Sequence, residues 1–169
     1  MKIIEGNIVD TTWREVGSFS ENQARQSMSK LGERQTELLS FVTTSMEELR
    51  PEAIELGIYI FFVIYRMFEK SIKVKFKRIS AKKMISVFKS NEEMLSKLDI
   101  AHDKFIEKIG KIEISKQPFV MKYLVEAIME TDQDLDPVFL SEGEIGSIFL
   151  ILKTVVDVLD ATLNKNSRN

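Results

Sequence analysis

Residues 51–79 read PEAIELGIYIFFVIYRMFEKSIKVKFKRI and include the longest uncharged apolar run of the chain, from Leu56 to Tyr65. On a helix, the apolar residues of this stretch cover nearly the whole circumference, which is typical of a helix buried on most sides. Ten residues are too few to span a membrane, which takes about 18 or more. The stretch therefore predicts a long, buried helix within an all-α fold.

Different signals mark the two ends of this helix. Pro51 suits the first helical position, because the N–H that it lacks would stay unpaired there anyway. Near the other end, residues 73–77 alternate between lysine and apolar residues, as a strand would. Ile72, Phe76 and Ile79 nevertheless keep the spacing of a helical face, so we predict that the helix continues to Ile79.

On the N-terminal side, a second long helix is predicted from about residue 20 to residue 48. Ser18-Phe19-Ser20-Glu21 has the Ser-x-x-Glu form of a capping box, which opens helices. Gln35 is the one interruption of an apolar stripe whose members are Ala24, Met28, Leu31, Leu38, Val42, Met46 and Leu49. Residues 1–17 carry apolar side chains without a steady period and are predicted to form an extended arm.

Three further helices are predicted towards the C-terminus. Ser80 is the expected N-cap of the first, whose apolar residues keep a heptad spacing as far as Ile112. The second covers about residues 118–131. The third begins at a capping box, Ser141 to Glu144, and the polar tail 164–169 is expected to fray.

These segments predict a five-helix, mostly antiparallel up-and-down bundle that forms a single helical domain, residues 1–169. Apolar residues make up 44% and charged residues 30% of the chain, which is ordinary globular composition. Cysteine is absent, which excludes disulfides and thiolate chemistry and fits a reducing compartment. The first residues lack the apolar core of a secretory signal. We therefore expect a cytoplasmic protein without a bound cofactor.

The only histidine of the chain is His102, on the apolar face of the predicted third helix. Asp99 and Asp103 lie within one turn of it, so these three side chains are the candidate metal ligands. Metal sites in helical bundles, however, combine Glu-x-x-His motifs from two separate helices, and one histidine cannot supply two. We favour a structural role for His102 and keep the metal site as an alternative.

Two other acidic patterns are incomplete. Glu52 and Glu55 resemble the first half of the paired motif that binds magnesium in all-α nucleotide pyrophosphohydrolases, but the required second half is missing after Glu69. The Asp-x-Asp-x-Asp run at 132–136 begins like a calcium loop, but Pro137 stands where that loop needs glycine. Neither pattern assigns a catalytic residue.

Positive charge concentrates between Arg66 and Lys83, with Lys73, Lys75, Lys77 and Arg78 at its centre. Such a basic patch attracts phosphate backbones. The net charge of the chain is only −2, and residues 126–144 contain an acidic stretch that could neutralise the patch internally. Binding of nucleic acid is therefore expected to be weak.

The solvent-facing stripe of the central helix contains two large aromatic residues. It runs through Glu55, Tyr59, Phe62 and Arg66, so an apolar centre lies between charged ends. Exposed clusters of this kind mark contact surfaces, and two-fold homodimers are the commonest way to cover them. The alternative is that Tyr59 and Phe62 are covered by other helices or by the N-terminal arm.

The sequence contains no serine nucleophile elbow and no glycine-rich phosphate loop. The leading hypothesis is therefore a non-enzymatic interaction or scaffolding protein that acts as an oligomer or with a protein partner. A helical bundle that binds a small molecule or a metal, with or without carboxylate-dependent enzyme activity, is the main competitor. A weak nucleic-acid-binding regulator is the third.

Overall fold

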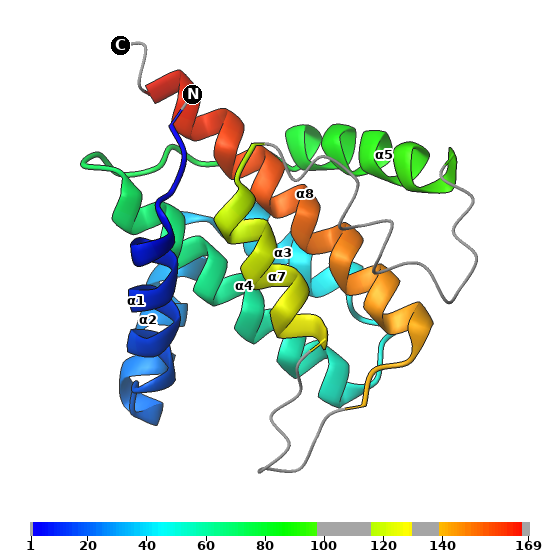
Figure 1. The fold of residues 1–169 in the computed structure, drawn as a ribbon, viewed down its shortest axis with the longest axis horizontal. Coiled ribbons are helices and arrows are strands. Elements are labelled where there is room, and N and C mark those ends of the chain that lie inside the picture. The colour runs from blue at the N-terminus through cyan, green and yellow to red at the C-terminus, as the bar shows by residue number, and fades with distance from the viewer. Residues whose placement is uncertain (1, 98–115, 130–138, 167–169) are drawn as a thin grey trace.

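The computed structural model describes residues 2–97, 116–129 and 139–166. Of these residues, 80% are helical, and no strand occurs among them. Seven helices are described rather than the five predicted: α1 (Gly6–Gly17), α2 (Glu21–Arg34), α3 (Thr36–Ser45), α4 (Pro51–Ser71), α5 (Ala81–Lys97), α7 (Pro118–Met129) and α8 (Glu142–Asn166) (Figure 1). The predicted all-α class is confirmed.

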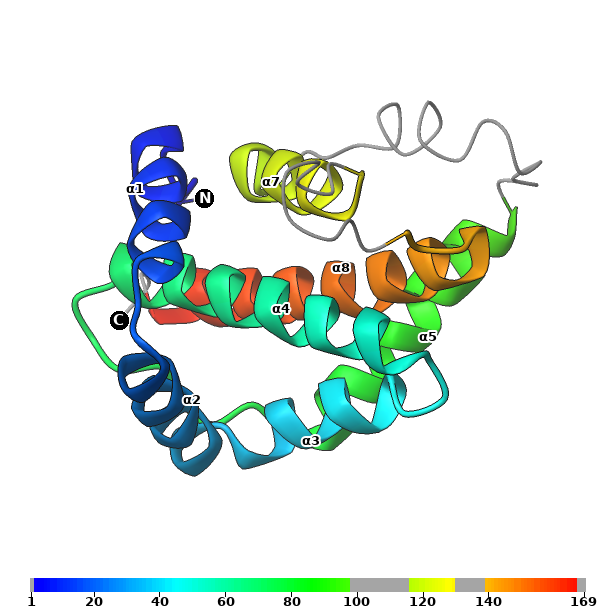
Figure 2. The same cartoon turned by 90° about the horizontal axis from the view of Figure 1, so that it is seen from below.

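The two longest helices, α4 and α8, lie side by side in the middle of the molecule (Figure 2). Helices α1 and α7 lie on one side of this pair, and α2 and α3 lie on the other. At one end, Arg50 binds Glu144 near the start of α8. At the other end, Lys2 bonds the carbonyl of Ser71 and the side chain of Asn164. The central helices therefore run parallel, which the predicted up-and-down order did not include.

The other neighbours of this pair follow the predicted antiparallel order. Helix α3 runs against α4 across the turn at 46–50, and α7 runs against α8 (Figure 2). Gln117, at the start of α7, bonds Asp160 near the end of α8 at 2.7 Å.

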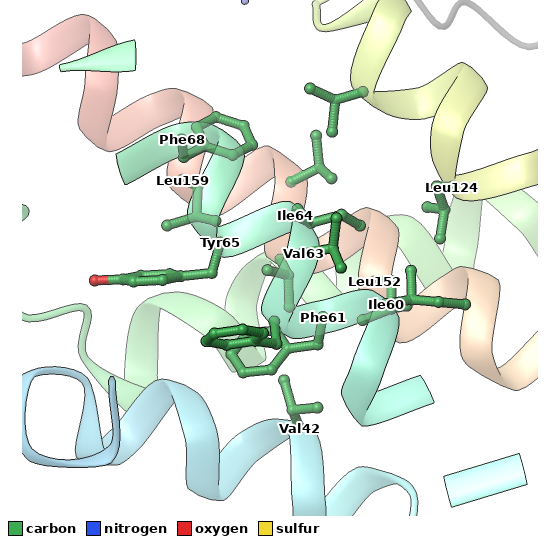
Figure 3. Packing of buried hydrophobic residues seen from close by; sticks show 14 of the residues in the cluster. Val42, Ile60, Phe61, Val63, Ile64, Tyr65, Phe68, Leu124, Leu152 and Leu159 are labelled. Atoms are coloured by element: carbon green, nitrogen blue, oxygen red, sulfur yellow. The ribbon is translucent and has the colours of Figure 1, made fainter. Parts of the chain in front are cut away.

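The core surrounds α4, as its apolar circumference predicted. Figure 3 shows side chains of α4 meeting others from α3, α7 and α8, among them Phe61, Ile64, Val42, Leu124 and Leu152. Full burial of such a side chain contributes roughly 1.5–3 kcal/mol. Buried residues of α4 face the helices on both sides, so the α4 side chains hold the layers together.

One glycine allows a particularly close approach in this core. A Cβ atom on Gly57 of α4 would lie 2.6 Å from Sδ of Met46, whose side chain is completely buried. Gly57 therefore makes room for the turn that leads from α3 into α4.

The predicted N-terminal arm is wrong for most of its length, because Gly6–Gly17 forms helix α1. The inward face of α1 consists of Val9, Thr12 and Val16. Thr12 is completely buried, and its hydroxyl bonds the carbonyl of Ile8 at 2.5 Å. A polar residue on the buried face hid the helical period from the sequence pattern.

The predicted helix over residues 20–48 is interrupted at Gln35, which separates α2 from α3. The backbone of Gln35 leaves the helical region, with φ −130° and ψ 55°. Its amide side chain is buried and bonds the backbone of residues 77 and 79. The capping box that opens α2 also differs from the prediction, because it joins Ser20 to Gln23 instead of Ser18 to Glu21.

The predicted continuation of the central helix to Ile79 is also wrong, since α4 ends at Ser71. A helix through this region would place Lys70, Lys73 and Lys77 on one face, where like charges repel. The chain instead extends, with Ile79 buried and the lysines exposed.

At the C-terminal helix, the predicted capping box is confirmed. The backbone N–H of Glu144 donates to the Ser141 hydroxyl at 3.2 Å, and the Glu144 carboxylate accepts from the Ser141 N–H at 2.9 Å. Helix α8 extends to Asn166, so the first three residues of the predicted frayed tail are helical. Among the described helices, none combines the length and the hydropathy needed to cross a membrane.

Candidate functional site

The three candidate metal ligands, Asp99, His102 and Asp103, lie outside the described residues, as does the acidic run 132–136. Within the described ranges, no three His, Asp or Glu side chains are grouped so that they could hold a metal ion. Glu52 and Glu55 are both exposed at the start of α4. The structural role predicted for His102 and the alternative of a metal site therefore both stay untested.

The fold separates the two aromatic residues that were predicted to lie together on the surface of α4. Phe62 is only 4% exposed and packs on Phe19, with 6.3 Å between the ring centroids. Tyr59 is 43% exposed. Phe62 thus belongs to the core of its own chain, and Tyr59 alone remains on the surface from the predicted pair.

Aromatic side chains from two other helices join Tyr59 in what we call the aromatic surface, which consists of Trp13, Tyr59, Phe119 and Tyr123. Trp13 of α1 is 41% exposed and Phe119 of α7 is 43% exposed. Helices α1 and α7 lie on the same side of α4 (Figure 2). Tyr59 is close to Gly17 of α1 and to Tyr123 of α7.

Two glycines of α1 lie close to aromatic side chains of this surface. A Cβ atom on Gly17 would lie 3.9 Å from the Tyr59 hydroxyl, and one on Gly6 would lie 3.4 Å from the Phe119 ring. Trp13 lies one turn before Gly17 and two turns after Gly6, so all three share one face of α1. The missing side chains let the rings of α4 and α7 approach α1.

The hydroxyl groups of the aromatic surface are neutral hydrogen-bonding groups. Burial raises the pKa of Tyr123, and the nearby Tyr59 raises it further. Burial also raises the pKa of Tyr59. Both phenols therefore keep their protons at physiological pH, and the centre of the surface carries no charge.

Arg66, predicted to lie at the edge of an interface, forms ion pairs within the chain. Its guanidinium donates to Glu15 of α1 at 3.0 Å and to Glu69 at 2.9 Å. Lys70 also pairs with Glu15. These ion pairs fix the end of α1 on α4, while the Nε of Arg66 is buried with no hydrogen-bond partner.

The predicted basic patch lies on the extended segment after α4. Lys73, Lys75 and Lys77 are exposed, and none forms an ion pair with another described residue. Arg78 donates to the carbonyl of Glu33 at 3.1 Å. Glu144, in the acidic stretch, binds Arg50 at the opposite end of α4, about 30 Å away for 21 helical residues. This carboxylate therefore cannot neutralise the patch.

A polar cluster between α5 and α8 is satisfied internally. Asn91 donates to Thr154 and to Asp157, and Lys153 donates to Asn91 and to Asp157 at 3.0 and 2.7 Å. Each polar group has a partner, so this cluster fixes the register of the two helices.

Comparisons with protein-family models, with curated proteins and with solved structures find no match for this chain. The aromatic surface and the basic segment are the features that remain for a functional argument. The sequence pattern indicated Tyr59 but gave no signal for Trp13, Phe119 and Tyr123. These three residues lie on α1 and α7, so they could be grouped with Tyr59 only once the positions of α1 and α7 against α4 were known.

Proposed function

We propose that this chain is a non-enzymatic interaction protein that forms a two-fold homodimer through the aromatic surface. The observation that carries the proposal is that Trp13, Tyr59 and Phe119, from three different helices, each keep over 40% of their area exposed in one region. Large aromatic residues are enriched at the centres of protein interfaces, where they dominate the binding energy.

A second copy of this chain is the occupant that fits the surface best. The centre is uncharged, and Glu55 and Arg14 stand at its edge; the guanidinium of Arg14 lies 5.4 Å from the centroid of the Trp13 ring. A surface with opposite charges around an apolar centre can pair with itself across a two-fold axis. The net charge of −2 opposes association of two copies only weakly.

The exposed area of the rings accounts for only part of a standard protein interface. Three aromatic side chains that are about two-fifths exposed contribute roughly 200–300 Å². A standard interface buries about 800 Å² on each partner. The aromatic surface is therefore the centre of the contact, and the polar residues of α1, α4 and α7 around it supply the remainder.

Light scattering coupled to gel filtration tests this proposal at protein concentrations of tens of micromolar. We expect a dimer that becomes a folded monomer when Tyr59→Glu or Trp13→Glu is introduced, because each places an unpaired charge at the centre of the contact. Ile85→Glu is the matched control, since Ile85 is 48% exposed on α5 and lies outside the aromatic surface.

The Phe62→Glu variant distinguishes the proposed aromatic surface from the contact surface predicted from the sequence, which included Phe62. Because Phe62 is buried against Phe19, this change should unfold the chain instead of yielding a folded monomer. A wild-type monomer at these concentrations would refute the homodimer, as would a dimer that all the glutamate variants leave intact.

A further inference from the structure

A polar hollow of about 170 Å³ lies between α2 and α4. Helix α2 lies on the side of α4 opposite to α7 (Figure 2). Lys30 and Arg34 of α2 and Arg66 of α4 bring three positive charges to its lining. Glu69 brings the one negative charge. The lining of the hollow therefore carries an excess of positive charge.

Helix α2 is an unusual neighbour for such a hollow. Leu31 is its only buried residue, and most of its remaining side chains are exposed. A helix that is polar on nearly every face gains little from packing on the core. The ion pair between Arg34 of α2 and Glu69 of α4, at 3.1 Å, adds a polar contact between the two helices.

The observed ion pairs do not neutralise this excess. Glu69 accepts from Arg34 at 3.1 Å and from Arg66 at 2.9 Å. Glu15 of α1 also accepts from Arg66, at 3.0 Å, and pairs with Lys70, so two carboxylates serve three cations. Lys30 forms no ion pair with another described residue. Cations on α2 and α4 therefore repel each other across the hollow, and a bound anion would relieve this repulsion.

A second hollow of about 150 Å³ adjoins the first. The two share Arg34, Tyr65 and Glu69, and the second adds Lys73 and Lys75 of the extended segment. The Arg34–Glu69 pair thus lies between two cation-lined hollows.

We infer that these hollows bind a small phosphate-bearing ligand, with one phosphate group held by Lys30, Arg34 and Arg66. Arginine presents a planar set of donors that matches phosphate oxygens, and lysine adds a compact positive charge. The first hollow has the size of a cavity that accepts benzene, so a phosphate group fits within it. A second phosphate of the same ligand would reach Lys73 and Lys75.

The lining favours a compact ligand over single-stranded nucleic acid. Proteins that bind single strands stack bases on exposed aromatic rings. The two aromatic residues of the first hollow, Phe62 and Tyr65, are only 4% and 3% exposed and offer no such surface. Recognition here depends on charge and hydrogen bonds, which a phosphate or diphosphate group satisfies.

Titration calorimetry with inorganic pyrophosphate, in 150 mM chloride, tests the inference. We expect saturable binding of one pyrophosphate per chain. Lys30→Gln and Arg34→Gln should each weaken it about tenfold, because each removes a charged hydrogen-bond donor. Lys30→Gln is the safer variant for folding, since it breaks no observed ion pair. Lys122→Gln, an exposed lysine of α7, is the control and should leave the affinity unchanged.

Inorganic phosphate, measured in parallel, distinguishes a one-phosphate from a two-phosphate ligand. Weaker binding of phosphate, together with a loss of pyrophosphate affinity in Lys73→Gln, would support the use of both hollows. Absence of saturable binding would overturn the inference, and so would equal losses in Lys122→Gln. Tighter binding of single-stranded DNA than of pyrophosphate would replace it with a polyanion surface. The oligomeric state is measured separately, so either proposal can fail without the other.

Discussion

The side chain of Gln35 makes the hydrogen bonds to the backbone around Ile79 that a neighbouring strand would make in a sheet. Its amide oxygen accepts from the N–H of Ile79 at 3.1 Å, and its amide nitrogen donates to the carbonyl of Lys77 at 3.0 Å. Gln117 does the same for the N-terminal segment, where it accepts from the N–H of Ile4 and donates to the carbonyl of Lys2. Buried glutamines thus hold both extended segments against the helices.

Replacing Gln35 by leucine should destabilise the protein by about 2 kcal/mol. Leucine fills a similar volume but leaves the buried N–H of Ile79 without a partner, which costs about 1–3 kcal/mol. Urea unfolding monitored by circular dichroism measures the change in the free energy of unfolding. Gln26→Leu, at an exposed position of α2, is the control and should change it by less than about 0.5 kcal/mol. An equal effect of the two variants would contradict the assigned role of Gln35.

Whether Gly57→Ala raises or lowers the free energy of unfolding should depend on the side chain of Met46. In the wild-type chain, the added Cβ meets the buried Met46 side chain at 2.6 Å, so overpacking should outweigh the helix-propensity gain and destabilise by about 1 kcal/mol. In a Met46→Ala background the space is free, and the same change should stabilise by up to about 1 kcal/mol. Chemical unfolding of the four proteins of this double-mutant cycle provides the measurement.

Gly146→Ala is the matched control for this cycle. Gly146 lies within α8, and nothing comes within 4 Å of a Cβ built on it. This variant should be more stable than the wild type by up to about 1 kcal/mol, whichever residue occupies position 46. Stabilisation by Gly57→Ala in the wild-type chain would contradict this expectation, because it would show that the Met46 side chain moves aside at no cost in free energy.

The Glu144–Arg50 pair should make stability depend on pH in the acidic range. The hydrogen bond from Arg50, together with those from Ser141, lowers the pKa of Glu144 from 4.5 to about 2. A carboxyl group whose pKa is lower in the folded state stabilises fully above its unfolded-state pKa, and this contribution is lost as the pH falls from about 4.5 towards 2.

Glu144→Gln should therefore lower the free energy of unfolding at pH 7, and its difference from the wild type should shrink as the pH falls from 5 to 2.5. Urea titrations across this range measure the difference. Glu126→Gln, in an exposed pair with Lys122 on α7, should show almost no difference at any pH. A gap between Glu144→Gln and the wild type that stays constant down to pH 2.5 would contradict the lowered pKa of Glu144.

Local signals in the sequence located several elements of this fold correctly. Pro51 opens α4, and the apolar circumference of that helix predicted its central, buried position. Ser141 and Glu144 predicted the start of α8, because a capping box uses only neighbouring residues. Periodicity failed for α1, where the fully buried Thr12 interrupts the apolar face and satisfies its hydroxyl on the preceding turn.

The sequence alone determined the all-α class, the start and the buried character of the central helix, and the capping box of α8, since periodicity and capping depend on residues within a few positions of each other. Tertiary structure decided that α4 and α8 run parallel, that Gln35 breaks a helix to bind residues 77 and 79, and that Phe62 is buried while Tyr59 is not. It also brought Trp13, Tyr59 and Phe119 into one region. These outcomes depend on contacts between residues more than 40 positions apart, and no local pattern encodes such contacts.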